Sequence, residues 1–288
     1  MKPLIIRKES TRYPGLFVRK YARQVFFGNL WDTNPELVES RGHVETADGR
    51  VVICPFTKVF NRFENGTDID RDELCIAVRK VNGFMAAVTW VDEVADVVVS
   101  TTGSLDSDFV SMAEEILGNH VKQFVKTMSN MVKGTYIFEI VHPNDPHIVH
   151  EEVGAYLIGF RESVEMGPYF SQATLEWLLD DEAKMMGVKR PEWEVDLFSN
   201  VVKKAKSCKH EGFVVYGQTS KTVLKIKSPY YLALKMAARR KDIQKLDKKL
   251  VDEEFYPLVD YLQQNVEHFT QLDEQARLQY MRDFLEKQ

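Results

Sequence analysis

The sequence lacks a long apolar stretch and contains little cysteine. No apolar stretch reaches the 18 residues that suggest a membrane-spanning helix. The basic start of the chain holds only a three-residue apolar run, at 4–6, which is too short for a secretory signal. Cys54, Cys75 and Cys208 are widely spaced and form no Cys-x-x-Cys pair, which argues against a disulfide framework or a zinc site. These absences predict a cytoplasmic protein with reduced thiols and no membrane association.

The common nucleotide-binding motifs are also missing. No Gly-x-Gly-x-x-Gly or Gly-x-x-x-x-Gly-Lys-(Ser/Thr) pattern follows a predicted strand, so neither a Rossmann fold nor a P-loop NTPase is supported. His142, His147 and His150 lie close together, but their spacing matches no standard zinc arrangement. We therefore interpret them as ordinary loop histidines.

The net charge of the chain is negative, but its positive charges are concentrated locally. The formal net charge of −5 argues against a surface that is positive throughout. Lysine and arginine nevertheless gather in three clusters, at 1–24, 203–209 and 228–250. Such a cluster either contacts phosphate groups or forms a solvated helix face, and the sequence leaves both interpretations open.

The centre of the chain is rich in short β-branched and aromatic runs, which are typical of strands. Apolar residues at helical spacing predict helices over 106–129 and 171–187. From about residue 230 the strand-like runs end and charged helical patterns continue. We predict an α+β domain over 1–228 and a small all-helical C-terminal domain over 229–288. The predicted strands are 51–56, 84–90, 97–102, 136–141, 156–160, 212–216 and 222–227.

The stretch VRKVNGFMAAVTW, residues 78–90, places a lysine beside an Asn-Gly pair and a mostly apolar run. Lys80 is either a strand-edge lysine at a turn or a covalent nucleophile, since a lysine amine attacks once it is deprotonated. In the second case Gly83 would let the backbone approach a bound ligand closely.

Two further patterns carry charge into predicted strands. Glu139 lies within the apolar strand YIFEIV and is either on the solvated face of an edge strand or a ligand for a ribose hydroxyl or a metal. Glu211 precedes the glycine that opens another strand. Lys225 and Lys227 share one face of a strand, as expected for a solvated sheet edge or for two lysines with an anion between them.

The order of these motifs resembles that of the covalent nucleotidyltransferase superfamily, which comprises ATP-dependent ligases, RNA ligases and capping enzymes. The nearest resemblance is to the phage-type RNA ligase 1 group, and it covers roughly residues 35–235. Further stretches that resemble this group are ESRG at 39–42, PFTKVFN at 55–61, STTGS at 100–104, FEIVHP at 138–143, FRE at 160–162 and KIKSPYYL at 225–232.

The resemblance implies a nucleotidyltransferase fold of antiparallel sheets with flanking helices. It also implies that Lys80 attacks the α-phosphate of ATP to form a lysyl-adenylate. Nearby cations would favour the neutral, nucleophilic amine. Mg²⁺ or Mn²⁺ would spread the developing charge. By the same resemblance, Glu139 would hold the ribose and a metal, and Glu211 would orient the metal. Lys225 and Lys227 would neutralise phosphates. Arg41 and Lys58 would reach the other phosphates or the leaving pyrophosphate.

Several features differ from the family's usual pattern, including Phe84, which stands where a small hydroxyl residue is expected. Asn82 stands where many relatives have aspartate, and Thr102 stands where a basic residue often precedes the glycine of the second patch. The C-terminal segment has no strand-rich region long enough for an OB-fold, which argues against capping enzymes and typical DNA ligases.

The sequence thus predicts an ATP-dependent RNA ligase that joins 5′-phosphate and 3′-hydroxyl RNA ends. We expect it to act as a monomer in the cytoplasm, either the cell's own or that of a phage host. Two alternatives stay open: a DNA-end or nick-sealing ligase of the same fold, and a non-catalytic nucleic-acid-binding relative.

Overall fold

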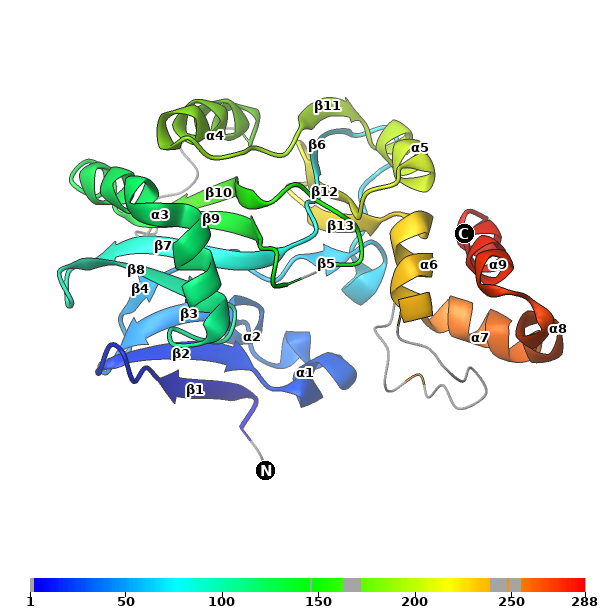
Figure 1. Cartoon of the computed structure of the whole chain (residues 1–288), viewed down its shortest axis with the longest axis horizontal. Coiled ribbons are helices and arrows are strands. Elements are labelled where there is room, and N and C mark those ends of the chain that lie inside the picture. The colour runs from blue at the N-terminus through cyan, green and yellow to red at the C-terminus, as the bar shows by residue number, and fades with distance from the viewer. Residues whose placement is uncertain (1–2, 146, 163–171, 239–247, 249–254, 288) are drawn as a thin grey trace. The chain divides into compact units, whose positions relative to one another are not determined.

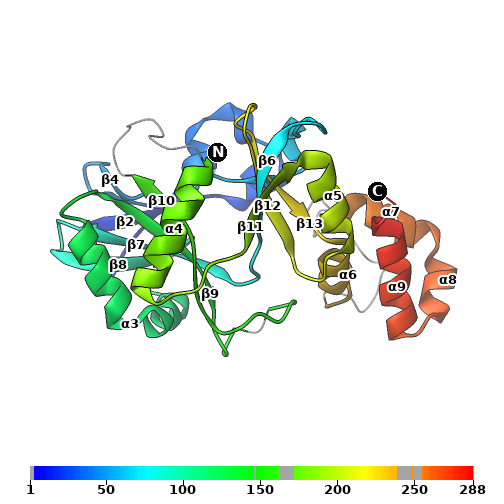
Figure 2. The same cartoon turned by 90° about the horizontal axis from the view of Figure 1, so that it is seen from above.

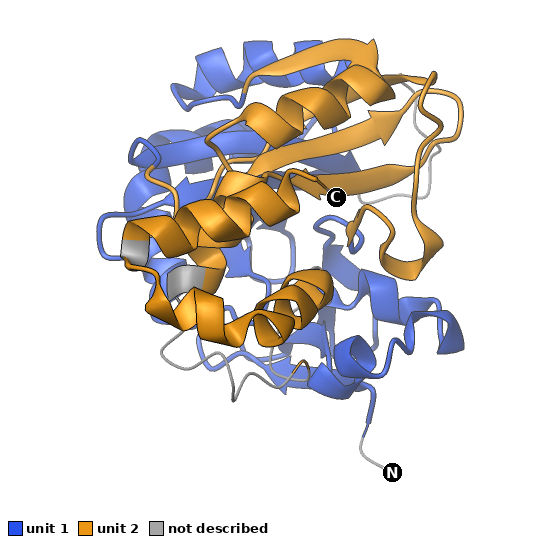
Figure 3. Ribbon diagram, turned by 90° about the vertical axis from the view of Figure 1, so that its right-hand side faces the viewer, with its two compact units in different colours: residues 1–58, 83–146, 151–191 blue, residues 59–82, 147–150, 192–288 orange. Residues whose placement is uncertain are grey.

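The computed structural model describes residues 3–145, 147–162, 172–238, 248 and 255–287, which form two compact units (Figures 1 and 3). Each unit is assembled from three segments that alternate along the chain. Unit 1 contains residues 1–58, 83–146 and 151–191, and unit 2 contains residues 59–82, 147–150 and 192–288.

Unit 1 is built on two four-stranded antiparallel sheets, in the orders β1-β2-β3-β4 and β10-β9-β7-β8. Apolar residues that face the space between the sheets form one core, in which Val18 and Val44 pack with Ala87 and Val98. The strands of the first sheet are β1 (Ile5–Glu9), β2 (Leu16–Tyr21), β3 (Arg41–Thr46) and β4 (Val51–Ile53). Those of the second are β7 (Phe84–Val91), β8 (Asp96–Thr101), β9 (Gly134–Val141) and β10 (Gly154–Glu162).

Helices α3 (Asp108–Met128) and α4 (Gln172–Met186) cover the outer face of the second sheet (Figures 1 and 2). Their apolar stripes pack against Tyr136, Phe138 and Ile140 of β9, which alternate along the strand as a buried face requires. Three short helices connect β2 and β3: α1 (Arg23–Phe27), η1 (Trp31–Thr33) and α2 (Glu36–Glu39).

Unit 2 contains a five-stranded sheet in the order β11-β6-β12-β13-β5. Helix α5 (Phe198–Ser207) packs on one face of this sheet, where Phe198 and Val201 meet Ala77, Val215 and Leu224. The pairings are antiparallel except that of β13 with β5. The strands are β5 (Phe60–Asn61), β6 (Leu74–Arg79), β11 (Trp193–Leu197), β12 (Gly212–Gly217) and β13 (Val223–Lys227), and the short helix η2 spans Glu64–Gly66.

The described part of the C-terminal segment is helical. Phe255, Leu258 and Phe269 belong to a second apolar core in unit 2, which α6 shares through Ala233 and Met236. The helices are α6 (Pro229–Ala238), α7 (Tyr256–Gln264), α8 (Val266–Gln271) and α9 (Glu274–Leu285). This core agrees with the predicted helical appendage, but the domain boundary at 228/229 stays a prediction, because the two compact units divide the chain elsewhere.

The α+β class with antiparallel sheets and flanking helices is confirmed. Every predicted strand occurs, although the one expected at 51–56 is confined to Val51–Ile53, and both central helices form. The sequence analysis missed strands β1, β2, β3, β5, β6 and β11. In the described residues, no helix combines the length and apolar character that crossing a membrane requires.

Candidate active site

Lys80 follows directly after strand β6, at one end of the unit 2 sheet. Its backbone N–H donates to the carbonyl oxygen of Gly212 at 2.9 Å. Gly212 is in turn the register partner of Lys227 on β13. The pairing of three strands thus brings Lys80, Gly212 and Lys227 to the same end of the sheet. Because β6 and β7 belong to different sheets, the Asn-Gly pair is not the turn of a hairpin.

The side chain of Glu211 joins the loop that carries Lys80. Its Oε2 lies 3.1 Å from Lys80 Nζ and accepts a hydrogen bond of 2.8 Å from Asn82 Nδ2. The Glu211 side chain is only 4% exposed, whereas that of Lys80 is 20% exposed. Asn82 Oδ1 accepts from the backbone N–H of Val149 at 3.1 Å, so both ends of the Asn82 amide are held.

This arrangement fixes the position of Nζ and places a carboxylate beside it. Cations around Lys80 stay a prediction, and the neighbour that the structure shows is the Glu211 carboxylate. A carboxylate at this distance favours the ammonium form, which has no lone pair for attack.

Lys225 and Lys227 alternate with Leu224 and Ile226 along β13. Leu224 and Ile226 face α5 in the apolar core, so the two lysines lie on the opposite face of the sheet. Lys227 Nζ lies 5.7 Å from the centre of the Tyr231 ring. Lys225 is the register partner of Asn61 on β5, so the KVFN and KIKS motifs meet in the structure although they are far apart in the sequence.

Glu139 lies in unit 1, on a strand with neighbours on both sides. Strand β9 pairs with β10 and β7, so the interpretation of Glu139 as part of an edge strand is wrong. The Glu139 side chain is intermediate in exposure, and its Oε1 accepts a hydrogen bond of 3.1 Å from the N–H of Gly83. A carboxylate at this position is therefore oriented by the backbone and still reachable from solvent.

Gly83 is required by the packing of its own backbone. A Cβ at this position would lie 2.3 Å from the carbonyl oxygen of Ile140, closer than any side chain tolerates. The sequence analysis assigned the glycine to close approach of a ligand. The structure shows a close approach to strand β9, and the approach to a ligand stays a prediction.

Arg41 and Lys58 occupy different surroundings in unit 1. Arg41 is the first residue of β3. Glu39, two residues before it in the sequence, forms an ion pair of 2.9 Å with Arg161 of the FRE stretch. Lys58 is only 7% exposed, and its Nζ lies 4.6 Å from the centre of the Trp31 ring. Lys58 therefore packs as a buried cation on an aromatic ring, which the sequence did not indicate.

Comparison with known proteins identifies the fold. No family model and no curated protein match the sequence. Two solved forms of an archaeal ATP-dependent RNA ligase match the structure with a TM-score of 0.61 each, at sequence identities of 14% and 15%. The matches cover 96% and 98% of this chain and 71% and 72% of the archaeal chains. A putative ATP-dependent DNA ligase from Aquifex aeolicus matches with a TM-score of 0.59 and 12% identity, over 97% of this chain and 74% of its own. The chain has the fold of ATP-dependent ligases.

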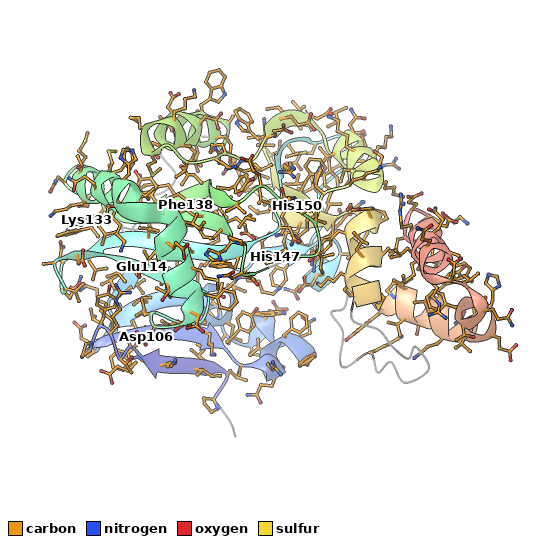
Figure 4. All side chains as sticks on the ribbon, in the orientation of Figure 1. Asp106, Glu114, Lys133, Phe138, His147 and His150 are labelled. Carbon is orange, nitrogen blue, oxygen red and sulfur yellow. The ribbon has the colours of Figure 1, made fainter. Side chains whose placement is uncertain are left out.

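Within this ligase fold, some residues of the basic clusters pair with carboxylates. In the first cluster, Arg7 pairs with Glu45 at 2.6 Å, and Arg12 pairs with Glu114 at 2.8 Å. Figure 4 shows Glu114 on α3. In the second cluster, Lys204 contacts Glu194 at 2.6 Å and also contacts Asp196. The cluster at 228–250 falls largely at 239–247 and 249–254, outside the described residues.

The histidines and cysteines of the ligase fold do not gather into a metal centre. His142 lies 3.3 Å from Glu115, and His147 and His150 belong to the short unit 2 segment at 147–150 (Figure 4). Among the residues that the structure describes, no group of three or more histidine, cysteine, aspartate or glutamate side chains could hold a metal ion. All three cysteines are free.

Sequence reasoning missed a polar cluster in unit 1 around His43. Its Nε2 lies 3.1 Å from Cys54 Sγ and 3.3 Å from Glu39 Oε2. Burial lowers the pKa of His43 to about 4, although the charge of Glu39 opposes this, and burial raises the pKa of the Cys54 thiol. Both residues are therefore neutral near pH 7.

Proposed function

We propose that this chain is an ATP-dependent RNA ligase that joins 5′-phosphate and 3′-hydroxyl RNA ends through a covalent adenylate on Lys80. The observation that carries the proposal is the contact of Lys80 Nζ with the buried Glu211 carboxylate, which Asn82 also binds. A solvated lysine at a turn has no need of a carboxylate held in this way. The fold of ATP-dependent ligases supports the same conclusion.

The first step forms a bond between Lys80 Nζ and the α-phosphorus of ATP and breaks the bond from that phosphorus to the pyrophosphate, which leaves. Lys225 and Lys227 neutralise the phosphates, and Arg41 and Lys58 contact the other phosphates or the pyrophosphate. Glu139 binds the ribose hydroxyls. The adenylate is then transferred to a 5′-phosphate, and the attack of a 3′-hydroxyl releases AMP and seals the strand.

The residues present fit a divalent cation such as Mg²⁺ or Mn²⁺. Lys80 and Asn82 both bind Oε2 of Glu211, which leaves Oε1 for a metal ion. Carboxylate oxygens are the ligands that Mg²⁺ prefers, and one or two suffice when phosphates complete the shell. Glu211 and Glu139 would hold the metal. When bound, it neutralises phosphate charge and weakens the preference of Glu211 for the Lys80 ammonium.

Incubation with ATP labelled in its α-phosphate and Mg²⁺ tests the proposal. The wild type should acquire an acid-stable label of AMP size, and Lys80→Ala should acquire none. Lys184→Ala is the matched control, because Lys184 is an exposed lysine on α4 that pairs with a neighbouring aspartate at 3.1 Å. Equal labelling of Lys80→Ala and the wild type would overturn the mechanism.

A second candidate is a ligase that seals DNA ends or nicks. The match to the putative DNA ligase has nearly the same TM-score as the matches to the RNA ligase, which favours keeping this candidate. Sealing assays on single-stranded RNA, single-stranded DNA and nicked duplexes distinguish the two. We propose the RNA substrate, and we propose the cytoplasm as the location because all three cysteines are free.

A further inference from the structure

Cationic side chains of the first sheet in unit 1 differ in their partners. Arg7 and Arg19 on the sheet both bind Glu45, at 2.6 Å and 3.1 Å. Lys20 and Arg41 are different, because their side chains form no ion pair or hydrogen bond within the described residues. Lys20 is exposed and Arg41 is intermediate in exposure.

The strand register places these two cations opposite each other. Lys20 of β2 pairs directly with Arg41 of β3, next to a bulge in the register. Directly opposed residues on neighbouring strands have Cβ atoms about 5 Å apart on one face of the sheet, and like charges in this arrangement repel. An anion between them converts the repulsion into two attractions.

The turn at 101–104 lies against both strands. A Cβ on Gly103 would lie 3.9 Å from Lys20 Cδ, and a Cβ on Gly42, the residue after Arg41, would lie 2.9 Å from Thr102 Cα. In the described structure, the backbone N–H groups of Thr102 and Gly103 donate no hydrogen bond. Successive N–H groups in a turn form a concavity that binds anions.

The carboxylate closest to this turn in the sequence is already occupied. Asp106 accepts hydrogen bonds from the Ser10 hydroxyl at 2.6 Å and from the N–H groups of Thr11 and Arg12 at 3.0 Å and 3.2 Å. It is therefore held by the loop between β1 and β2 and does not neutralise Lys20.

We propose that Lys20, Arg41 and the N–H groups of Thr102 and Gly103 form a binding site for a phosphate group. The ligand is a phosphate of a nucleic-acid strand or the pyrophosphate portion of ATP. Thr102 stands where a basic residue often precedes the glycine of this patch. In the proposed site, Lys20 on strand β2 supplies the positive charge at this turn in its place. The link of this phosphate to strand joining rests on the proposed function, whereas the binding itself does not.

Binding measurements on the full chain test the site with two probes. One arm measures the anisotropy of a short, dye-labelled RNA with a 5′-phosphate over a range of salt concentrations, and the other titrates pyrophosphate calorimetrically. Lys20→Ala should weaken binding of at least one probe about tenfold, and Lys20→Arg should remain within about twofold of the wild type. If RNA is the ligand, the slope of log affinity against log salt should become shallower by about 0.7 in Lys20→Ala.

The arm that responds identifies the source of the phosphate. If Lys20→Ala binds both probes with affinities within about twofold of the wild type, the proposed site is wrong. An equal loss of affinity in the control Lys184→Ala would also overturn it. Both arms work without any reaction. A wild type that fails to become labelled by ATP but loses binding on Lys20→Ala would therefore refute the proposed function and leave this site standing.

Discussion

Glu211 in unit 2 and Glu139 in unit 1 lie in different surroundings. Unit 2 buries the Glu211 carboxyl group and places Lys80 Nζ and the Asn82 amide against it. Unit 1 leaves Glu139 partly exposed and orients it with the N–H of Gly83, and it buries His43 in the neutral form. A buried charge needs a partner, whereas a partly exposed carboxylate remains available for a ligand. We therefore propose that Glu211 positions Lys80 and that Glu139 binds a group of the ligand.

Replacing Glu211 should have the largest effect. Glu211→Gln keeps an oxygen that can accept from Asn82, but it removes the charge that holds Lys80 and suits a metal. We expect labelling by ATP to slow at least about 100-fold. Thermal unfolding of the same variant serves as the control for folding. Labelling at the wild-type rate would show that Glu211 is only a structural partner of Lys80.

Gly83→Ala should disturb the backbone that orients Glu139. The new Cβ would meet the Ile140 carbonyl oxygen at 2.3 Å, so the free energy of unfolding should fall by about 1–3 kcal/mol. Denaturant titration measures this loss. Gly103→Ala is the matched control for stability, because its Cβ would meet no atom closer than 3.9 Å. Equal stability of both variants would contradict the close approach.

Acid should destabilise unit 1 through His43. The unfolded chain binds a proton at His43 below its ordinary pKa of 6.5, whereas burial keeps the native pKa at about 4. The contribution of neutral His43 to the free energy of unfolding is therefore complete above pH 6.5 and is lost as the pH falls toward 4. At pH 5 the loss should be about 1–2 kcal/mol. Denaturant titrations at pH 7 and pH 5 should show a smaller pH effect in His43→Gln. An unchanged pH effect would assign the acid sensitivity to other groups.

Glu139→Gln should have the smallest effect of the four. The amide oxygen of glutamine can still accept from Gly83, so the orientation is retained while the charge is lost. We expect the ATP concentration for half-maximal labelling to rise about three- to tenfold, the size of one weakened hydrogen bond. If Glu139→Gln slowed labelling by ATP as much as Glu211→Gln does, the two glutamates would not differ in their roles.

Sequence patterns predicted several strands that bury continuous apolar surface, but not the inner strand β6 (LCIAVR). Strands such as β7 and β9 are rich in β-branched and aromatic residues, and their packing follows from composition. Strands β1 (IIRKE) and β11 (WEVDL) escaped prediction because they are short edge strands with many charged residues. Their pairing depends on neighbouring strands and leaves little local signal.

The candidate site shows a similar division. The motifs identified Lys80 and Glu211, but the hydrogen bonds that link them to Asn82 and Val149 join residues far apart in the sequence. Asn82 seemed a departure from the aspartate of many relatives. In the structure its amide donates to one carboxylate and accepts from a backbone N–H, which an ionised aspartate could not do. Only the tertiary structure reveals that requirement.

The alternation of the units along the chain has a consequence for any attempt to divide this protein. Unit 1 and unit 2 each draw on three separate segments, so no single cut releases either of them whole. One crossing is the peptide bond between Asn82 and Gly83, and each residue is hydrogen-bonded within its own unit, to Glu211 and to Glu139. The chain two residues beyond Lys80, the proposed nucleophile, is thus held by hydrogen bonds on both sides of this crossing.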